Sequence, residues 1–455
     1  MNAIDAQKFG ALTEQIRAGM ERHGIPGVAV GLCVDGGEWA EGFGVTSLEN
    51  PLPVTPDTLF QVGSISKTFT GTLVMRLVEA GKLELDVPVR RYLPDLELAD
   101  ESVAEAVTLR HLLTHTAGWA GDLFIRTGNG EDALHKYVLE MARLKQLTPL
   151  GKVWSYNNAA FALAGRVIEA VMDQPYEVVC REWILQPLGL GHSFFFPEEV
   201  MVHRFAVGHL PINGEPRIAH PWALARNANA VGGLSSTVRD LLRYARFHLN
   251  GGKTEGSEQI LSPESVAAMQ IPQVSAADRQ QMGLSWFLRE VNGVRIVSHG
   301  GATNGQMASL WFVPARRFAF AILTNHHYGG LLNNEVGKWA RENLLGMREP
   351  TREPVPARPE QFSQYAGRYL EGAMGNRIDL EPHDGGLVFR FAAGDRSGIT
   401  DTPADLPPPM KVGMLEPDWL TLTDGPGKGA LLEFLRDENG QIEWVRYSSR
   451  VYRRQ

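Results

Sequence analysis

The chain has 455 residues, of which 44% are hydrophobic and 21% are charged, and its formal net charge is -8. A chain of this length exceeds the size at which one hydrophobic core stops growing, so we expect two domains. The composition is typical of a folded globular protein and excludes a disordered or collagen-like chain. The acidic and basic residues are interspersed, so the sequence offers no basic surface for nucleic acid or for an anionic membrane.

The cysteines and the N-terminal segment indicate the compartment. Cys33 and Cys180 are far apart in apolar surroundings, which favours two buried thiols over a disulfide. Residues 1–24 resemble an amphipathic helix and lack the basic start, apolar run and cleavage site of a signal peptide. No stretch of 18 apolar residues follows. We therefore expect a cytoplasmic protein, or a periplasmic or secreted one if a leader has been removed.

The first elements in chain order are a helix and a β-hairpin. The helical pattern stops at His23-Gly24, and the apolar run 27–34 then turns into the run 39–45. A loop follows, and a long helical pattern extends from Ser64 to Ala80, before Gly81. Ser64 is thus predicted to lie where a helix begins.

Helical patterns dominate the middle of the chain and strand-like runs return after it. Helices are predicted at 108–115, 132–144, 158–172, 176–184 and 237–249, the last with Thr237 and Asp240 as a capping pair. Strands are predicted at 282–290, 295–298, 309–313 and 318–324, with a closing helix at 331–345. This order predicts an α+β domain over residues 1–347: an antiparallel sheet assembled from both ends of the segment, flanked by helices, and a helical subdomain beside it.

The last hundred residues have a different pattern. Four prolines alternate with charged residues between positions 348 and 360, a composition typical of a stiff, exposed linker. Short alternating runs follow, separated by Gly, Pro and Asp. They predict a second, smaller all-β domain over 361–455, shaped as a barrel or sandwich, with strands at 367–370, 377–381, 387–391, 419–423, 431–435 and 442–447.

Ser64-Ile65-Ser66-Lys67 is the first motif with chemical meaning, and this chain has no other Ser-x-x-Lys. The backbone N–H of a serine in the first helical turn is free to bind an oxyanion. Lys67, three residues on, lies on the same helix face and can reach the hydroxyl. It can act as the base only if its pKa falls well below the ordinary value. Taken alone, the motif also fits an ordinary helix start.

Two further groups could join this serine. Tyr156-Asn157-Asn158 precedes a helix, where Tyr156 could exchange protons with the nucleophile and Asn158 could contact a substrate carbonyl and Lys67. Read alone, it is a helix cap with a packed tyrosine. His299-Gly300-Gly301-Ala302 ends a predicted strand, where the Ala302 N–H could be a second oxyanion donor and His299 a polar or cationic contact. Read alone, it is a strand ending in a turn.

Together the three groups resemble the signature of the serine β-lactamases and penicillin-binding proteins. Their order and spacing resemble one branch of this family, which contains class C β-lactamases, D-alanyl-D-alanine carboxypeptidases, D-aminopeptidases and β-lactamase-like esterases. Segments 26–30, 85–89, 111–118 and 232–236 agree, so the resemblance covers about residues 5–347. It implies that Ser64 attacks a carbonyl, that Lys67 and Tyr156 share the general-base work, and that Ser64 and Ala302 bind the oxyanion. It also implies a structural turn for His111 and His115, with Trp119 as a candidate wall of the cleft.

One departure from the signature bears on the substrate. His299 stands where the β-lactamases typically carry a lysine, and a histidine is only partly charged at neutral pH. This favours an esterase, amidase or D-amino-acid peptidase with at most weak β-lactamase activity. The second domain resembles the lipocalin-like modules of some D-aminopeptidases, esterases and peptide-cyclising thioesterases of the penicillin-binding-protein type.

The sequence leaves three functions open. The first is hydrolysis of small esters, amides or D-amino-acid peptides through an acyl-enzyme. The second is acyl transfer, including peptide cyclisation, and the third is a non-catalytic penicillin-binding or sensor protein. No histidine–carboxylate cluster has metal spacing, so we expect no metal and no cofactor. We expect a small-molecule or short-peptide substrate and no nucleic-acid or membrane partner, and a homo-oligomer remains open.

Overall fold

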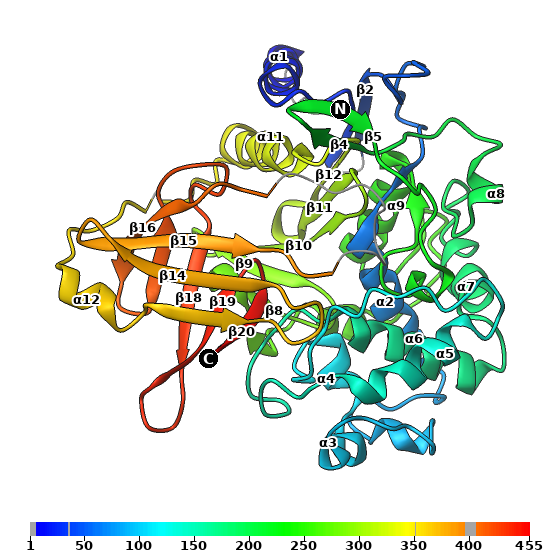
Figure 1. Ribbon diagram of the computed structural model, residues 1–455. Helices are drawn as coiled ribbons and strands as arrows, with labels where there is room; N and C mark the ends of the chain where they lie inside the picture. Colours follow the sequence, from blue (N-terminus) through cyan, green and yellow to red (C-terminus); the bar gives the residue numbers. More distant parts are fainter. Residues whose placement is uncertain (1–5, 35–36, 351, 396–405) are drawn as a thin grey trace.

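The computed structural model describes residues 6–34, 37–350, 352–395 and 406–455. Two β-structures dominate it: an open eight-stranded sheet and a closed eight-stranded barrel (Figure 1). The open sheet joins the N-terminal hairpin to the late strands, in the order β2-β1-β12-β11-β10-β9-β8-β7, and its printed pairs are antiparallel. The structure therefore confirms the predicted α+β class and the sheet assembled from both ends of the first segment.

The sheet has helices on both faces because its central strands are apolar on both sides. In β1 (Gly27–Val34), Val28, Val30 and Leu32 pack in one hydrophobic cluster, whereas Ala29 and Cys33 pack in another. The period of two along a strand sends neighbouring side chains to opposite faces. Helices α1 (Ala6–His23) and α11 (Gly329–Leu344) cover the first face, and α9 (Val238–Leu249) covers the second. The remaining strands of this sheet are β2 (Gly37–Gly44), β7 (Val274–Ser275), β8 (Gln281–Met282), β9 (Phe287–Val291), β10 (Val294–Ala302), β11 (Met307–Val313) and β12 (Phe318–Thr324).

The helical subdomain lies beside the second face of the sheet. Its central helix is α2 (Ser66–Glu79), whose residues are mostly buried, and α6 (Asn158–Met172) packs against it. The Asn157 side chain caps α6 by accepting from the Ala160 N–H at 2.9 Å. The other helices of the first domain are α3 (Glu101–Ala106), α4 (Leu109–Leu113), α5 (Ala133–Glu140), α7 (Tyr176–Cys180), α8 (Pro197–Val200) and α10 (Pro263–Met269). The helix α12 (Pro359–Ser363) packs against the barrel.

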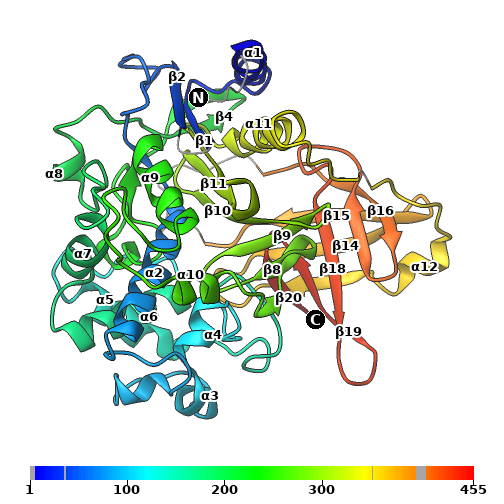
Figure 2. The same cartoon turned by 180° about the vertical axis from the view of Figure 1, so that it is seen from behind.

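The C-terminal segment forms the barrel in consecutive strand order, which confirms the predicted all-β domain. Figures 1 and 2 place it beside the β8–β9 side of the large sheet. Two of its strands, β16 and β20, were not predicted from the sequence. The barrel strands are β13 (Gly367–Leu370), β14 (Arg377–His383), β15 (Gly386–Ala392), β16 (Met410–Glu416), β17 (Trp419–Leu422), β18 (Leu431–Arg436), β19 (Ile442–Tyr447) and β20 (Arg450–Arg454).

The proline-rich segment is attached to both sides. Glu349 forms an ion pair with Arg289 at 2.8 Å, and the Val355 N–H donates to the Met414 carbonyl at 2.8 Å. We keep residues 348–360 as a proposed linker between a domain at 1–347 and one at 361–455.

Two smaller predictions can be compared with the structure. Both cysteines are free and buried, as expected. Thr237 caps α9 by accepting from the Asp240 N–H at 3.1 Å, as the capping pair predicts, while the Asp240 carboxylate accepts from the His192 N–H and the Ser193 hydroxyl. Within the described residues, the helices are too short or too polar to cross a membrane.

Candidate active site

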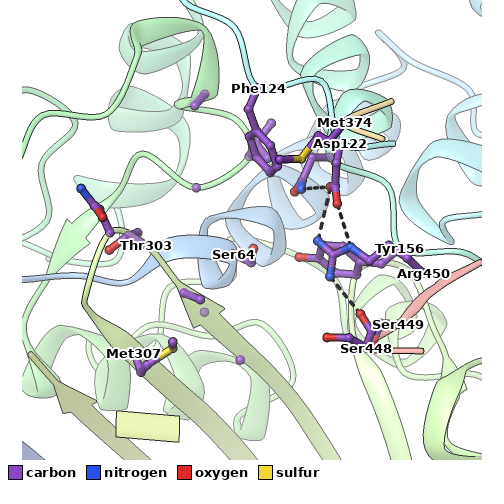
Figure 3. Close-up of a pocket in the computed structure, with 18 of the residues that line it drawn as sticks. Ser64, Asp122, Phe124, Tyr156, Thr303, Met307, Met374, Ser448, Ser449 and Arg450 are labelled. Atoms are coloured by element: carbon purple, nitrogen blue, oxygen red, sulfur yellow. Dashed lines mark hydrogen bonds and ion pairs between the residues drawn. The ribbon is translucent and has the colours of Figure 1, made fainter. Parts of the chain in front are cut away.

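Ser64 lies at the junction of a 3-10 turn and a helix. The turn spans Gly63–Ile65 and continues directly into α2. Gly63 has a φ of 52°, a left-handed conformation that favours glycine. The Ser64 side chain faces a large cleft between the two domains (Figure 3). The sequence prediction that this serine begins a helix is thus confirmed.

Lys67 lies beneath Ser64 and is fully buried. Its Nζ donates to the Ser64 Oγ at 3.0 Å and to the Val231 carbonyl oxygen at 2.9 Å. Burial holds the pKa of Lys67 well below its usual range, the positive charge of Arg450 lowers it further, and Asp122 raises it in part. A lysine in this state can be the neutral base that an attacking serine requires.

Tyr156 contributes a phenol to the same place. Lys67 Nζ lies 4.9 Å from the centre of the Tyr156 ring. Burial raises the pKa of Tyr156 well above its ordinary value, and the Ser64 hydroxyl and the Arg450 charge oppose only part of this rise. Tyr156 therefore keeps its proton at neutral pH. Its hydroxyl is buried, interacts with the Ser64 hydroxyl and lines the cleft, so it can exchange protons with the nucleophile and with a bound substrate.

His115 holds this tyrosine, in keeping with the structural turn expected for it. The His115 ring stacks on the Tyr156 ring at 4.3 Å, and its Nδ1 accepts from the Asn157 N–H at 3.0 Å. Burial holds the pKa of His115 well below its usual value, so the ring is neutral. His111 has a capping role: its Nδ1 accepts from the Thr108 N–H at 3.2 Å, at the start of α4.

The third motif lies on β10, against the turn that carries Ser64. A Cβ on Gly301 would lie 1.9 Å from the Val62 carbonyl oxygen and 3.1 Å from the Ser64 nitrogen. A Cβ on Gly63 would lie 2.6 Å from the Ala302 nitrogen. Only glycine permits such close approach, which brings the backbones of Ser64 and Ala302 together. His299, Gly300, Gly301 and Ala302 all line the cleft.

Of the two contacts expected for His299, polar or cationic, the structure favours the polar one. Its Nδ1 is 2.6 Å from the Gly300 carbonyl oxygen, while its Nε2 is buried without a partner in the described part of the chain. Burial lowers the pKa of His299 to about 3, and the Lys67 charge contributes to this shift. The ring is therefore neutral at physiological pH, not partly charged. Its contact with a substrate would be that of a polar, uncharged group.

Asn158 lines the cleft as predicted, but its partner is not Lys67. Its amide donates to the Asp122 carboxylate at 2.6 Å. Lys67 instead binds the Val231 carbonyl. Asp122 is buried, lines the cleft and belongs to none of the three sequence motifs.

Trp119 is not a wall of the cleft. Its side chain is buried in the core of the helical subdomain, and the residue is absent from the cleft lining. Its carbonyl oxygen accepts from the Asn157 amide at 2.9 Å. Trp119 thus contributes to the position of the second motif through its backbone.

The cleft has a volume of about 1480 Å³ and receives walls from both domains. The barrel contributes a side that no motif predicted, and this side carries the charged residue Arg450. The guanidinium lies over the Tyr156 ring at 4.7 Å and pairs with Asp122 at 2.9 Å (Figure 3). The barrel residues that line the cleft include Met374, Asn376, Phe391, Tyr447, Ser448, Ser449, Arg450 and Tyr452.

Arg450 lies in Ser-Ser-Arg-Val-Tyr-Arg-Arg, a segment without any recognisable spacing. No sequence signal for its role was available. In the part of the chain that the structure describes, no group of three or more His, Cys, Asp or Glu side chains could hold a metal ion.

The chain resembles known proteins in sequence along the first domain and in structure along both. A family model described as Beta-lactamase matches residues 12–340. "Penicillin-binding protein 4" from Amycolatopsis lactamdurans is 35% identical over 368 residues, which are 78% of this chain and 96% of that protein.

Two solved structures align along nearly the whole chain, including the barrel. The crystal structure of SurE has a TM-score of 0.75 at 25% identity and covers 98% of each chain. The octameric penicillin-binding protein homologue from Pyrococcus abyssi has a TM-score of 0.67 at 25% identity and covers 98% of this chain and 99% of its own. With the matches in sequence, these likenesses agree with the geometry around Ser64, and the chain belongs to the beta-lactamase family of serine hydrolases.

Proposed function

We propose that the protein hydrolyses small esters, amides or D-amino-acid peptides through an acyl-enzyme on Ser64. The observation that carries this proposal is the contact of 3.0 Å between Lys67 Nζ and Ser64 Oγ, made by a lysine whose pKa burial holds far below its usual range. A neutral amine beside a serine hydroxyl is the pairing that nucleophilic catalysis needs. A charged lysine could only donate a hydrogen bond to the Ser64 hydroxyl and could not accept its proton.

The geometry supports an order of proton transfers. Lys67 accepts the Ser64 proton while Oγ forms a bond to the substrate carbonyl carbon. The oxyanion faces the backbone N–H groups of Ser64 and Ala302. Tyr156, which keeps its proton, donates to the leaving oxygen or nitrogen, and the acyl group remains on Ser64. Water then cleaves the acyl ester with the proton transfers reversed.

The charge of the cleft bears on which substrates it takes. His299 is neutral, and the Arg450 charge is paired with Asp122, so neither presents a free cation to a substrate carboxylate. β-Lactam drugs carry such a carboxylate. We therefore propose that β-lactam turnover is weak beside ester or amide hydrolysis.

Replacement of the nucleophile tests the proposal. Wild-type protein should turn over p-nitrophenyl acetate, and Ser64→Ala should reduce kcat/KM at least a hundredfold, because no acyl-enzyme can form. Ser363→Ala is the matched control, since Ser363 is exposed on α12 of the barrel and should retain full activity. Intact-protein mass spectrometry should find the acyl group on wild type and not on Ser64→Ala. Equal turnover by Ser64→Ala and wild type would refute the assignment.

Acyl transfer is a second candidate, favoured by the size of the cleft. Its volume of about 1480 Å³ exceeds the upper range of ordinary ligand sites, about 1000 Å³, and leaves room for an acceptor amine beside the acyl chain. Product mass spectrometry with D-leucine amide added to the ester assay separates the two reactions. An amide product that rises with amine concentration would favour transfer, whereas acid alone would favour hydrolysis. A mass shift with a labelled penicillin that never decays would favour a sensor.

A further inference from the structure

The barrel is bonded directly to the second catalytic motif. The strands β19 and β20 form a hairpin that runs along residues 154–156 of the first domain. The Tyr156 N–H donates to the Ser449 carbonyl oxygen at 2.8 Å, and the Val451 N–H donates to the Ser155 hydroxyl at 3.2 Å. The hairpin thus holds the backbone of Tyr156, whose phenol takes part in the proposed proton transfers.

Arg450 extends this contact into the cleft. Its side chain is 27% exposed and pairs through Nε with Asp122, which is 8% exposed. Asp122 also accepts from the Asn158 amide at 2.6 Å, so one carboxylate joins the barrel to the second motif. The Arg450 guanidinium lies over the Tyr156 ring, 4.7 Å from its centre. Lys67 Nζ lies 4.9 Å from the centre of the same ring. A permanent positive charge is therefore held next to both proton-transfer groups by a residue of the other domain.

We propose that Arg450 is a positioning residue for the Ser64 reaction, supplied by the barrel: its charge adds to burial in keeping Lys67 in the neutral, proton-accepting form, and Asp122 holds and balances that charge. This inference rests on the proposed function, because it concerns the base of the same acyl transfer to Ser64. It gives the barrel a part in the chemistry in addition to its part in the cleft wall.

The titratable and charged groups that face Lys67 come from five parts of the chain. Burial keeps the pKa of His115 and of His299 low, so both rings are neutral near pH 7, and Tyr156 is a neutral phenol. Arg450 and Asp122 are then the charged groups that act on Lys67, with opposite signs and with Arg450 the stronger of the two. These groups are His115 after α4, Asp122 before α5, Tyr156 before α6, His299 on β10 and Arg450 on β20.

The two charges predict opposite displacements of the pH profile. The reaction needs neutral Lys67, so kcat/KM rises with pH through the Lys67 pKa. Arg450→Gln removes a positive charge and should move this acidic limb to higher pH by about one unit, a tenfold loss of kcat/KM below the midpoint. Asp122→Asn removes a negative charge and should move the limb to lower pH. Because Arg450 is the stronger of the two charges, the midpoint of the double variant should lie between the wild-type value and that of Arg450→Gln.

Two further variants separate charge from docking. Arg450→Lys keeps the charge without the two-pronged contact to Asp122, so its midpoint should stay near wild type even where kcat falls. Arg446→Gln is the matched control on the same hairpin. Arg446 Nε donates to the Trp154 carbonyl oxygen at 3.2 Å, but its charge is not among those that shift Lys67. Its midpoint should not move.

The experiment measures kcat/KM for p-nitrophenyl acetate between pH 5 and pH 10, with Ser64→Ala as the blank, on folded full-length variants checked by circular dichroism. Opposite shifts for Arg450→Gln and Asp122→Asn support the inference, since a loosened domain contact would move both in one direction or neither. Unmoved midpoints in both variants, with turnover that depends on Ser64 intact, would overturn this inference alone. Wild-type protein without such turnover would overturn the proposed function as well.

Discussion

At the scale of single residues, the buried amine of Lys67 is reactive but lowers the stability of the folded state. The unfolded chain holds this lysine charged below about pH 10.4, whereas burial keeps the folded-state pKa well below that value. The unfolded state therefore binds the extra proton, and the folded state loses stability as pH falls from the unfolded value toward the folded one. The loss is about 1.4 kcal/mol per pH unit within this window.

Lys67→Met should remove this loss, because methionine fills the same apolar space without an amine. We expect the variant to be inactive yet more stable than wild type at pH 7, and the gain should shrink as the pH rises toward 10. Urea unfolding at both pH values measures it. A variant whose advantage is the same at pH 7 and pH 10 would contradict a lowered Lys67 pKa, since only a titrating group makes the difference depend on pH.

The residue scale also shows where sequence patterns end. Ser64, Lys67 and Tyr156 were identified because their spacing fits one known constellation, and the structure brings them together. Asp122 and Arg450 face each other across 328 positions of the chain and stand in no repeated spacing. A single sequence holds no record of such a pairing. His299 was identified from the sequence, but its charge state was not. The charge depends on burial in the folded protein, which the neighbouring residues in the sequence do not predict.

At the scale of elements, β10 fits against the Ser64 turn because Gly301 has no side chain, whereas the neighbouring Gly300 has room for one. A Cβ on Gly301 would lie 1.9 Å from the Val62 carbonyl oxygen, whereas a Cβ on Gly300 would meet nothing nearer than the Ala308 carbonyl oxygen at 3.7 Å. Gly301→Ala should therefore separate the strand from the turn and lower the free energy of unfolding by about 2 kcal/mol or more. Gly300→Ala should change it by less than about 0.5 kcal/mol.

Chemical denaturation of both glycine variants measures the difference, and acylation of Ser64 by p-nitrophenyl acetate reports whether the oxyanion backbone is displaced. We expect Gly301→Ala to lose the acylation that wild type displays. Equal stability of the two variants would show that β10 moves freely against the turn, and the close packing drawn from the glycines would be wrong.

Sequence periodicity located most elements because their cores follow a regular pattern. The predicted runs 158–172, 318–324 and 442–447 coincide with α6, β12 and β19. The strand β20 was missed because Arg-Val-Tyr-Arg-Arg is rich in arginine, and barrel closure rather than hydrophobic patterning makes it a strand. The predicted strand 282–290 is divided into β8 and β9, with Ser285 between them at a φ of 62°.

At the scale of the whole molecule, a buried ion pair of the barrel lies at its contact with the catalytic domain. Arg446 pairs with Glu433 inside the barrel wall and donates to the Trp154 carbonyl oxygen of the first domain. Burial raises the pKa of Glu433, and Arg446 opposes that rise. The composition shift near residue 348 predicted a separate domain, but it could not predict that this domain completes the cleft, since the contact depends on surfaces formed only after folding.

Removing one partner of the pair should therefore weaken the protein more than removing both. Arg446→Gln leaves the Glu433 carboxylate buried without its cation, a loss of about 3 kcal/mol, and also removes the bond to Trp154. Arg446→Gln with Glu433→Gln should recover part of that stability, because no unpaired charge remains. Urea unfolding of the single and double variants at pH 7 measures the coupling. Since the Glu433 pKa is raised, the single variant should regain stability as the pH falls and the carboxylate takes up a proton, whereas a loss that is constant from pH 7 to pH 5 would argue against a buried charge.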